Sequence, residues 1–272
     1  MARASRRQRA GYRVRGEICI GTATFFSFVA VILLIFAHVG QINTSTIPRD
    51  ISMAKVNIST YGAALHTAIV DPVQGLYTTN FSAPLEQHAG LRQFYLFGLY
   101  SHCAFTDKAL GLCSNVTTAT QWTPFTAVVN DMPTNYSTLT LGLVPPDLTF
   151  VNSHYLGEFT RAAYYLLLMG TVCAGLAMLI GLWKRTLTYV ISTSFAVFGT
   201  TLLLMGVTIW TVIIHKAQDI NSAFVVVGSQ QSTVPLGITV STGAGLWLFW
   251  GAFISLFLSM GPYMIACCTY RG

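Results

Sequence analysis

The chain has 272 residues, of which 53% are hydrophobic and only 9% are charged, with a formal net charge of +6. An ordinary soluble domain is about 25% charged, and four long uncharged runs would leave a soluble fold almost no polar surface, so the composition indicates a membrane protein. The basic balance does not point to nucleic acid, because six of the fifteen basic residues are arginines in the first fifteen positions, directly before an apolar run.

Four apolar segments are long enough to cross a membrane, which takes about 20 residues in a helix. The predicted transmembrane helices are 18–42, 161–183, 186–215 and 243–266. Apolar regions of signal peptides run to only about 7–15 residues and end at a small-residue cleavage site, whereas the first segment is longer and continues into "FAHVGQ". We therefore expect the first segment to be retained as a membrane anchor.

Basic residues beside these segments predict the orientation, because short flanks rich in Lys and Arg stay in the cytoplasm. The arginine-rich segment 1–17, the basic turn 184–185 and the tail 267–272 are therefore predicted to be cytoplasmic, and both termini with them. Segments 43–160 and 216–242 are predicted to face the outside. The N-terminal arginines also suit contact with anionic lipid head groups, although orientation alone would explain them equally well.

Five Asn-x-Ser/Thr sequons fall in the outer segment 43–160, and the predicted helices and short loops hold none. Sequons of this kind are glycosylated in surface loops of secretory-pathway proteins, so their placement agrees with the topology predicted from charge. The candidate N-glycosylation sites are Asn43, Asn57, Asn80, Asn115 and Asn135.

Two pairs of cysteines are candidates for covalent chemistry. Only Cys103 and Cys113 fall in the compartment predicted to be oxidising, so we expect a disulfide between them, with free or intermolecular thiols as the alternative. Cys267 and Cys268 are adjacent at the inner end of the last helix. That position suits S-acylation, although two small apolar residues that end a helix would look the same.

The sequence shows no catalytic or metal-binding pattern. A structural metal site needs about four ligands, and only His102 adjoins the cysteine pair; His66, His88 and His102 stand singly and are interpreted as surface residues. The apolar cores of the predicted helices hold no Asp, Glu, Lys or Arg, the residues that usually mark ion pathways in membranes. We therefore expect no enzymatic activity, no cofactor and no transport.

Segments rich in β-branched and aromatic residues, bounded by Gly, Pro or Asn, predict strands in the outer region. They are 51–60, 75–82, 92–105 and 136–144, with a hairpin in 216–242. The predicted fold is an all-α transmembrane four-helix bundle with a small extracellular antiparallel β-sheet. At about 1.5 Å per residue the third helix exceeds the roughly 30 Å hydrocarbon core, so its end around 210–215 is expected to rise toward the sheet.

Small residues recur at helical spacing in two of the predicted helices, where they let neighbouring backbones approach closely. Contact within the bundle is the simpler interpretation, and association with another copy or another membrane protein is the alternative. The stripes are Gly170, Ala174, Ala177 and Gly181 in the second helix, and Gly251, Ser255 and Ser259 in the fourth.

Three stretches carry a resemblance to a known group. "LLIFAHVGQI" closes the first helix, "IPRDISMAKVNIST" opens the outer segment, and "GLYSHC" places the turn Gly98, Leu99 and Tyr100 before the first outer cysteine. With four helices and both ends inside, the chain resembles the claudin-like superfamily and, more closely, the fungal Sur-seven/PalI family. Claudins carry Trp where this chain has Tyr100.

The resemblance implies a multi-pass plasma-membrane protein of the cell cortex that is not an enzyme. It would organise furrow-like membrane domains (eisosomes) and support cell-wall or septum assembly, with lipids, cortical proteins and possible further copies of itself as partners and no nucleic acid. The alternative is an accessory or regulatory subunit of a channel, a calcium-influx system or a wall-synthesising enzyme, including a role in cell fusion.

Overall fold

The computed structural model describes residues 2–69, 73–106, 110–183, 186–227 and 232–269, with backbone alone at 2–18, 69, 186, 226–227, 232 and 265–269. The predicted basic turn 184–185 lies outside these ranges, as do the side chains of Cys267 and Cys268. The chain forms two compact units. One contains 1–35, 165–207 and 247–272, and the other contains 36–164 and 208–246.

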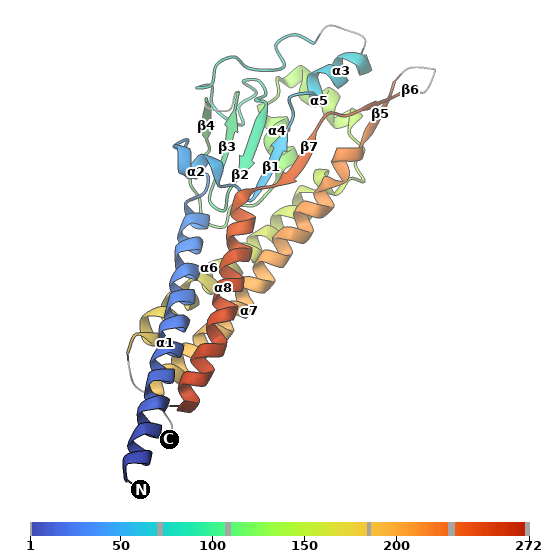
Figure 1. The fold of residues 1–272 in the computed structure, drawn as a ribbon. Coiled ribbons are helices and arrows are strands. Elements are labelled where there is room, and N and C mark those ends of the chain that lie inside the picture. The colour runs from blue at the N-terminus through green and yellow to red at the C-terminus, as the bar shows by residue number, and fades with distance from the viewer. Residues whose placement is uncertain (1, 70–72, 107–109, 184–185, 228–231, 270–272) are drawn as a thin grey trace. The chain divides into compact units, whose positions relative to one another are not determined.

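The first unit is helical and contains most of four long helices, labelled in Figure 1. They are α1 (Ala2–Val39), α6 (Ser153–Gly181), α7 (Thr186–Ala217) and α8 (Ala244–Thr269). Within the described residues, four helices are long and apolar enough to cross a membrane by length and composition: Cys19–Val39, Ser153–Gly181, Leu187–Ser222 and Ala244–Met264. The predicted class, a four-helix membrane protein with a small antiparallel sheet, is confirmed.

The small residues of α6 face other helices of the same unit. Ala174 and Ala177 are fully buried. A Cβ added to Gly170 would come within 2.9 Å of Leu203 on α7, and one added to Gly181 would come within 2.6 Å of the hydroxyl of Tyr263 on α8. This stripe therefore serves contact within the helical unit, the simpler of the two interpretations.

The stripe of α8 is less completely covered. Ser259 is buried and donates to the carbonyl of Leu256 at 2.6 Å, whereas Gly251 and Ser255 are half-buried. A Cβ on Gly251 would lie 3.3 Å from Leu33 of α1. Both stripes thus have neighbours inside the unit.

The second unit is built on a five-stranded antiparallel sheet with the order β4-β3-β2-β1-β7 (Figure 1). Its strands are β1 (Ala54–Asn57), β2 (Phe94–Phe97), β3 (His102–Phe105), β4 (Gly111–Cys113) and β7 (Thr239–Thr242). The last strand comes from the second outer segment and pairs with the first, with Ala54 opposite Thr242. The core-facing positions alternate along β1 and β2, as expected for a sheet buried on one face.

Short helices complete the unit: α2 (Thr46–Asp50), α3 (Tyr61–Ile69), α4 (Pro124–Asp131), α5 (Thr134–Leu143) and the 3-10 turns η1 (Thr149–Val151) and η2 (Gln218–Ser222). A separate hairpin joins β5 (Phe224–Val227) to β6 (Ser232–Pro235). The strands expected within 51–60 and 92–105 and the hairpin in 216–242 are therefore present.

Two strand predictions were wrong. Segment 136–144 belongs to helix α5, because its buried residues Tyr136, Ser137 and Thr140 follow a helical period and Thr140 contacts the buried Tyr61 hydroxyl at 2.7 Å. Here tertiary contacts outweigh the β propensity of Thr and Tyr. Segment 75–82 makes only one isolated bridge, between Tyr77 and Leu91.

Candidate functional site

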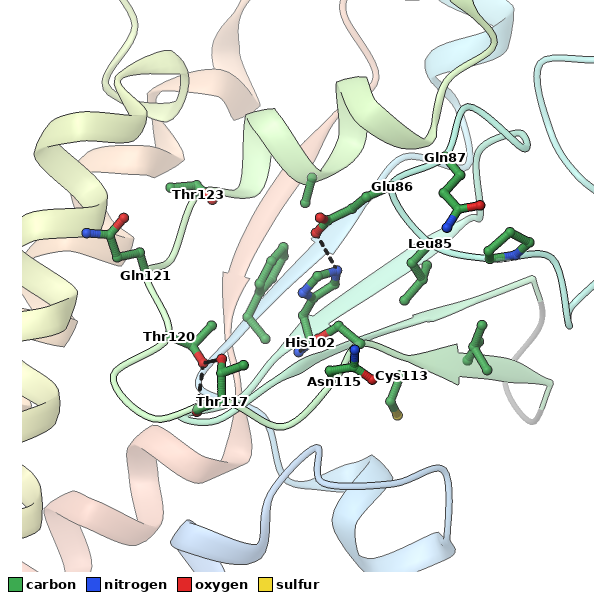
Figure 2. A pocket seen from close by; sticks show the side chains of 15 residues that line it. Leu85, Glu86, Gln87, His102, Cys113, Asn115, Thr117, Thr120, Gln121 and Thr123 are labelled. Atoms are coloured by element: carbon green, nitrogen blue, oxygen red, sulfur yellow. Dashed lines mark hydrogen bonds and ion pairs between the residues drawn. The ribbon is translucent and has the colours of Figure 1, made fainter.

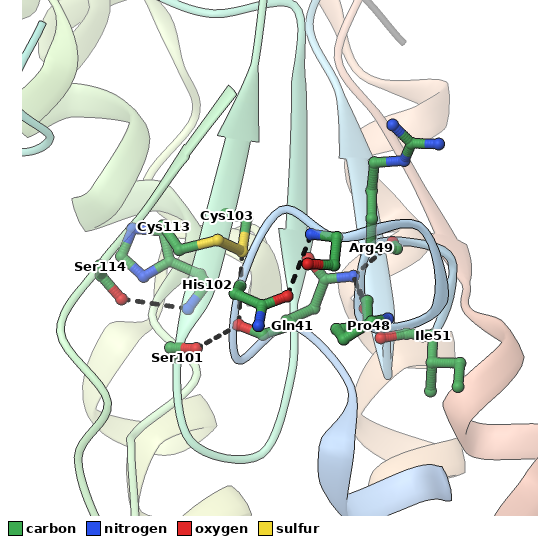
Figure 3. Close-up of a disulfide and its surroundings, with 11 residues drawn as sticks. Gln41, Pro48, Arg49, Ile51, Ser101, His102, Cys103, Cys113 and Ser114 are labelled. Carbon is green, nitrogen blue, oxygen red and sulfur yellow. Dashed lines mark hydrogen bonds between the residues drawn. A yellow bond between two sulfur atoms is a disulfide. The ribbon is translucent and has the colours of Figure 1, made fainter. Parts of the chain in front are cut away.

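The three stretches that carry the family resemblance meet in the second unit, around the buried side chain of Gln41. Its amide nitrogen lies 3.0, 2.6 and 3.0 Å from the carbonyl oxygens of Pro48, Arg49 and Ile51 (Figure 3). Gln41 also has a φ of 59°, a left-handed conformation that is uncommon outside glycine. A single polar side chain therefore closes the loop that follows α1 onto α2.

The other side of Gln41 supports the turn before the first cysteine. The backbone carbonyl oxygen of Gln41 accepts a hydrogen bond from the Ser101 hydroxyl and lies 3.3 Å from the sulfur of Cys103 (Figure 3). Gly98 donates its backbone N–H to the carbonyl of Ser101 at 2.9 Å, which closes the turn. "GQI", "IPRDI" and "GLYSHC" are thus three parts of one buried hydrogen-bonded junction.

Glycine is required at Gly98 by close approach of backbones. A Cβ there would lie 2.7 Å from the carbonyl oxygen of Gly40 and 2.8 Å from the Cβ of Gln41. Gly40 is equally confined, since its Cβ would lie 2.6 Å from the carbonyl oxygen of Ile51. Sequence reasoning identified Gly98 as a turn glycine, but the absence of a side chain, rather than its backbone freedom, is what the junction uses.

We expect Gly98→Val to destabilise the protein by about 1–3 kcal/mol, the usual cost of forcing extra atoms into a packed site. Gly142→Val is the matched control, because a Cβ at Gly142 meets nothing within 4 Å. Thermal unfolding of both variants in detergent, followed by tryptophan fluorescence, measures the difference. Equal unfolding temperatures for the two variants would contradict the steric explanation.

The two outer cysteines lie opposite each other on β3 and β4 and are joined by a disulfide (Figure 3). The neighbouring turn is largely enclosed: Leu99 is 2% exposed, and the Tyr100 hydroxyl pairs with a ring nitrogen of His38 at 2.8 Å. Tyr100 also packs edge-on against Tyr164. Its burial raises its pKa to about 12, so the hydroxyl stays protonated. The aromatic residue of this turn is therefore half-buried against His38 and Tyr164.

Arg92 and Asp131 form a buried ion pair in the second unit. Arg92 and Asp131 are 0% and 1% exposed, with Nη1 and Oδ2 3.4 Å apart. Asp131 also accepts a hydrogen bond from the Tyr95 hydroxyl at 2.6 Å, and Arg92 donates to the carbonyls of Ala83 and Phe81. Burial raises the pKa of Asp131, and its hydrogen-bond donors and Arg92 oppose that rise. Most polar atoms of the pair are thus satisfied.

This ion pair holds a surface loop in place. Asp131 Oδ1 accepts a hydrogen bond from the backbone N–H of Glu86 at 2.5 Å. The backbone carbonyl of Asp131 accepts one from the backbone N–H of Gly90 at 2.8 Å. Glu86 and His88 both have left-handed φ values, 59° and 56°. Such conformations persist where the surroundings determine them, and they cluster at functional sites. The buried carboxylate therefore fixes the direction in which Glu86 points.

Glu86 points into an open cavity of about 480 Å³ on the second unit (Figure 2). Its Oε1 lies 3.5 Å from Nε2 of His102, and within the described parts of the chain this nitrogen has no hydrogen-bond partner. The volume is within the usual range of ligand pockets, about 300–1,000 Å³. The lining residues are Pro84, Leu85, Glu86, Gln87, Phe97, His102, Leu112, Cys113, Ser114, Asn115, Thr117, Thr120, Gln121, Thr123 and Ala127.

His102 corrects the interpretation of the outer histidines as surface residues, because it is only 7% exposed; His66 and His88 are exposed as expected. Burial lowers the pKa of His102 to about 4. Burial, and secondarily the charge of Asp131, raises the pKa of Glu86. At neutral pH the imidazole is therefore neutral and the pocket carries only the charge of Glu86.

The buried imidazole makes stability depend on pH. Below pH 6.5 the unfolded chain takes up a proton at His102 that the folded protein resists down to about pH 4, so stability is fully present above pH 6.5 and falls with acidification. We expect a loss of about 2 kcal/mol between pH 7 and pH 5 from this group. The raised pKa values of Glu86 and Asp131 act in the opposite direction at the acid end of this range.

Unfolding temperatures at pH 7 and pH 5 measure this effect. His102→Gln should reduce the difference between the two temperatures, and His66→Gln, at an exposed histidine, should leave it unchanged. An unchanged difference in His102→Gln would show that another group is responsible.

All five sequons lie in the second unit. Asn43, Asn80, Asn115 and Asn135 are exposed and Asn57 is half-buried. In Asn43, Asn57 and Asn80 the side-chain oxygen accepts the backbone N–H two residues on, at 2.9–3.0 Å, an Asx-turn. Four of the candidate acceptors are therefore open to a modifying enzyme.

The class of protein follows from this geometry: four helices able to span a membrane, joined to a disulfide-bonded antiparallel sheet. Comparison with protein-family models matches the SUR7/PalI family over residues 19–260. The chain therefore belongs to the SUR7/PalI family, a claudin-like family of membrane proteins. A search of curated proteins finds no match.

Proposed function

We propose that this protein organises cortical domains of the plasma membrane and supports cell-wall or septum assembly, without catalysing a reaction. The observation that carries the proposal is the family match over 19–260, which covers most of the four long helices and all of segments 43–160 and 216–242. In the proposed topology both termini are cytoplasmic and the second unit faces the wall.

The arrangement of the three stretches that carry the family resemblance fits this role, because they build a buried hydrogen-bonded junction around Gln41. A sheet cross-linked by the Cys103–Cys113 disulfide suits an oxidising, extracellular environment. The helices present many large apolar side chains on their outer faces, such as Phe25, Met169 and Phe257, as contact with lipid or with neighbouring membrane proteins requires.

Live imaging of a tagged copy tests the proposed role. Static cortical patches or a septal ring would support it, and a uniform signal in internal membranes of healthy cells would contradict it. Purification in mild detergent adds a second readout. Recovery of one large partner at fixed stoichiometry would instead favour the accessory-subunit function.

The proposed orientation predicts N-glycosylation. We expect glycosidase treatment of the protein from a eukaryotic host to raise its electrophoretic mobility by several glycans. Replacing Asn43, Asn80, Asn115 and Asn135 with Gln should reduce this shift stepwise, and Asn57→Gln should reduce it least, because Asn57 is half-buried. No shift at all would overturn the placement of 43–160 outside.

A further inference from the structure

The pocket on the second unit is a built site with unused hydrogen-bonding capacity. Nε2 of His102 is buried and has no hydrogen-bond partner among the described residues, although buried polar atoms are nearly always satisfied. The nearest charged group, the carboxylate of Glu86, lies 3.5 Å away. The Glu86 side chain is 47% exposed, so a polar ligand group can reach its carboxylate directly, and it reaches the imidazole nitrogen behind it only when that carboxylate moves aside.

The walls of the pocket are fixed by the elements described above. The loop that follows Cys113 is tied to the turn before β3: Ser114 Oγ accepts the N–H of His102 at 3.1 Å, and Thr117 N and Thr120 Oγ1 donate to the carbonyl of Tyr100 at 2.8 and 2.9 Å. The opposite wall is the Glu86 loop, held by Asp131. The pocket is therefore pre-formed, which lowers the entropic cost of binding.

The chemistry of the lining disfavours an anionic ligand. Among the residues that the structure describes, hydroxyl and amide groups dominate the lining, the one carboxylate is Glu86, and no Lys or Arg contributes. An anion would find no cation to neutralise it. The amides of Gln87 and Gln121 offer both donors and acceptors, which suits a ligand that both donates and accepts hydrogen bonds. Leu85 and Leu112 add apolar surface.

We propose that this pocket binds a neutral sugar unit, with a hydroxyl donated to the Glu86 carboxylate and a hydroxyl paired with Nε2 of His102. A sugar ring supplies several hydroxyls that each donate and accept, together with apolar C–H faces, in a volume that suits the cavity. Two sources share this chemistry: a polysaccharide chain, and the protein's own glycan on Asn115, whose side chain lines the pocket rim (Figure 2).

This inference goes beyond the organising role proposed above and is tested separately from it. Binding is measured on the purified full-length protein in a detergent without a sugar head group, so a failed localisation experiment leaves the result intact. The probes are soluble oligosaccharides of β-linked glucose and of N-acetylglucosamine, with oligogalacturonate as an anionic control. We expect saturable binding of one neutral series and none of the anionic one.

Variants assign the binding to the pocket. Glu86→Gln should weaken it at least tenfold, and Leu112→Trp should abolish it by filling the cavity, whereas Asp50→Asn, the same chemical type of change at an exposed carboxylate outside the pocket, should leave it unchanged. Unfolding temperatures near that of the wild type show that Glu86→Gln and Leu112→Trp remain folded.

Asn115→Gln separates the two sources. Equal binding with and without this substitution identifies an external saccharide, and binding that appears only in Asn115→Gln shows that the protein's own glycan occupies the pocket. No saturable binding of either neutral series to both proteins would overturn the proposal, as would binding that Glu86→Gln and Leu112→Trp leave unchanged.

Discussion

Asp131→Ala is expected to lower the unfolding temperature of the protein by about 10 °C, corresponding to a loss of about 3–5 kcal/mol. The substitution leaves the guanidinium of Arg92, which is 0% exposed, without its counter-charge. It also removes the acceptor for the Tyr95 hydroxyl and for the backbone of Glu86. Tryptophan fluorescence is a suitable probe, because Trp122 and Trp210 are buried in the same unit.

Two further variants show whether the charge is responsible. Arg92→Met combined with Asp131→Asn removes both charges and keeps an acceptor for Tyr95, so it should recover at least half of the loss. Asp50→Ala breaks the exposed Arg49–Asp50 pair, and should cost less than about 1 kcal/mol. A double variant as unstable as Asp131→Ala would show that packing, and not the buried charge, sets the cost.

Removing the disulfide with Cys103→Ser and Cys113→Ser together is the second large effect, at about 2–5 kcal/mol. The bond links β3 to the edge strand β4, and Cys103 is fully buried against the carbonyl of Gln41. Loss of the disulfide should therefore loosen the edge strand β4, the hydrogen-bonded junction around Gln41 and one wall of the pocket. The four long helices should still insert, since insertion depends on their apolarity.

The expected phenotype is a full-length, membrane-inserted protein that is retained in the endoplasmic reticulum. Imaging and protease protection measure retention and insertion. Cys19→Ser, which removes a free thiol, is the control and should behave as wild type. Cys103→Ser alone should be worse than the double variant, because it leaves Cys113 free to form intermolecular bonds. Normal surface delivery of the double variant would show that the bond is dispensable.

Segments whose structure is determined by their own residues, without distant contacts, were predictable from the sequence. The long helices follow from uncharged apolar runs, and β1, β2 and β3 follow from short alternating strands near Gly and Asn. Helix α5 was not predictable, because its Thr and Tyr residues favour strands until Tyr61 and Gln74 bind them in the folded unit.

The pocket was missed because its two main groups are 16 positions apart in sequence and give no local pattern. Glu86 owes its direction to Asp131, which follows 45 residues later. One clue to a buried charge was present in the sequence: Arg92 lies two residues before the aromatic strand β2, where an unpaired charge would be costly to bury. Finding its partner required the fold.

The pairing of β1 with β7 has a consequence for how the protein is made. Four strands of the sheet are complete early in synthesis, but β7, which pairs with the free edge of β1, is synthesised only after α7. Ala54 therefore has no partner on that edge until Thr242 has been made. Until then β1 is an open edge, a template for wrong pairing with other chains. A chain whose synthesis ends before β7 would thus carry an unpaired β1 edge, which chaperones can recognise and retain.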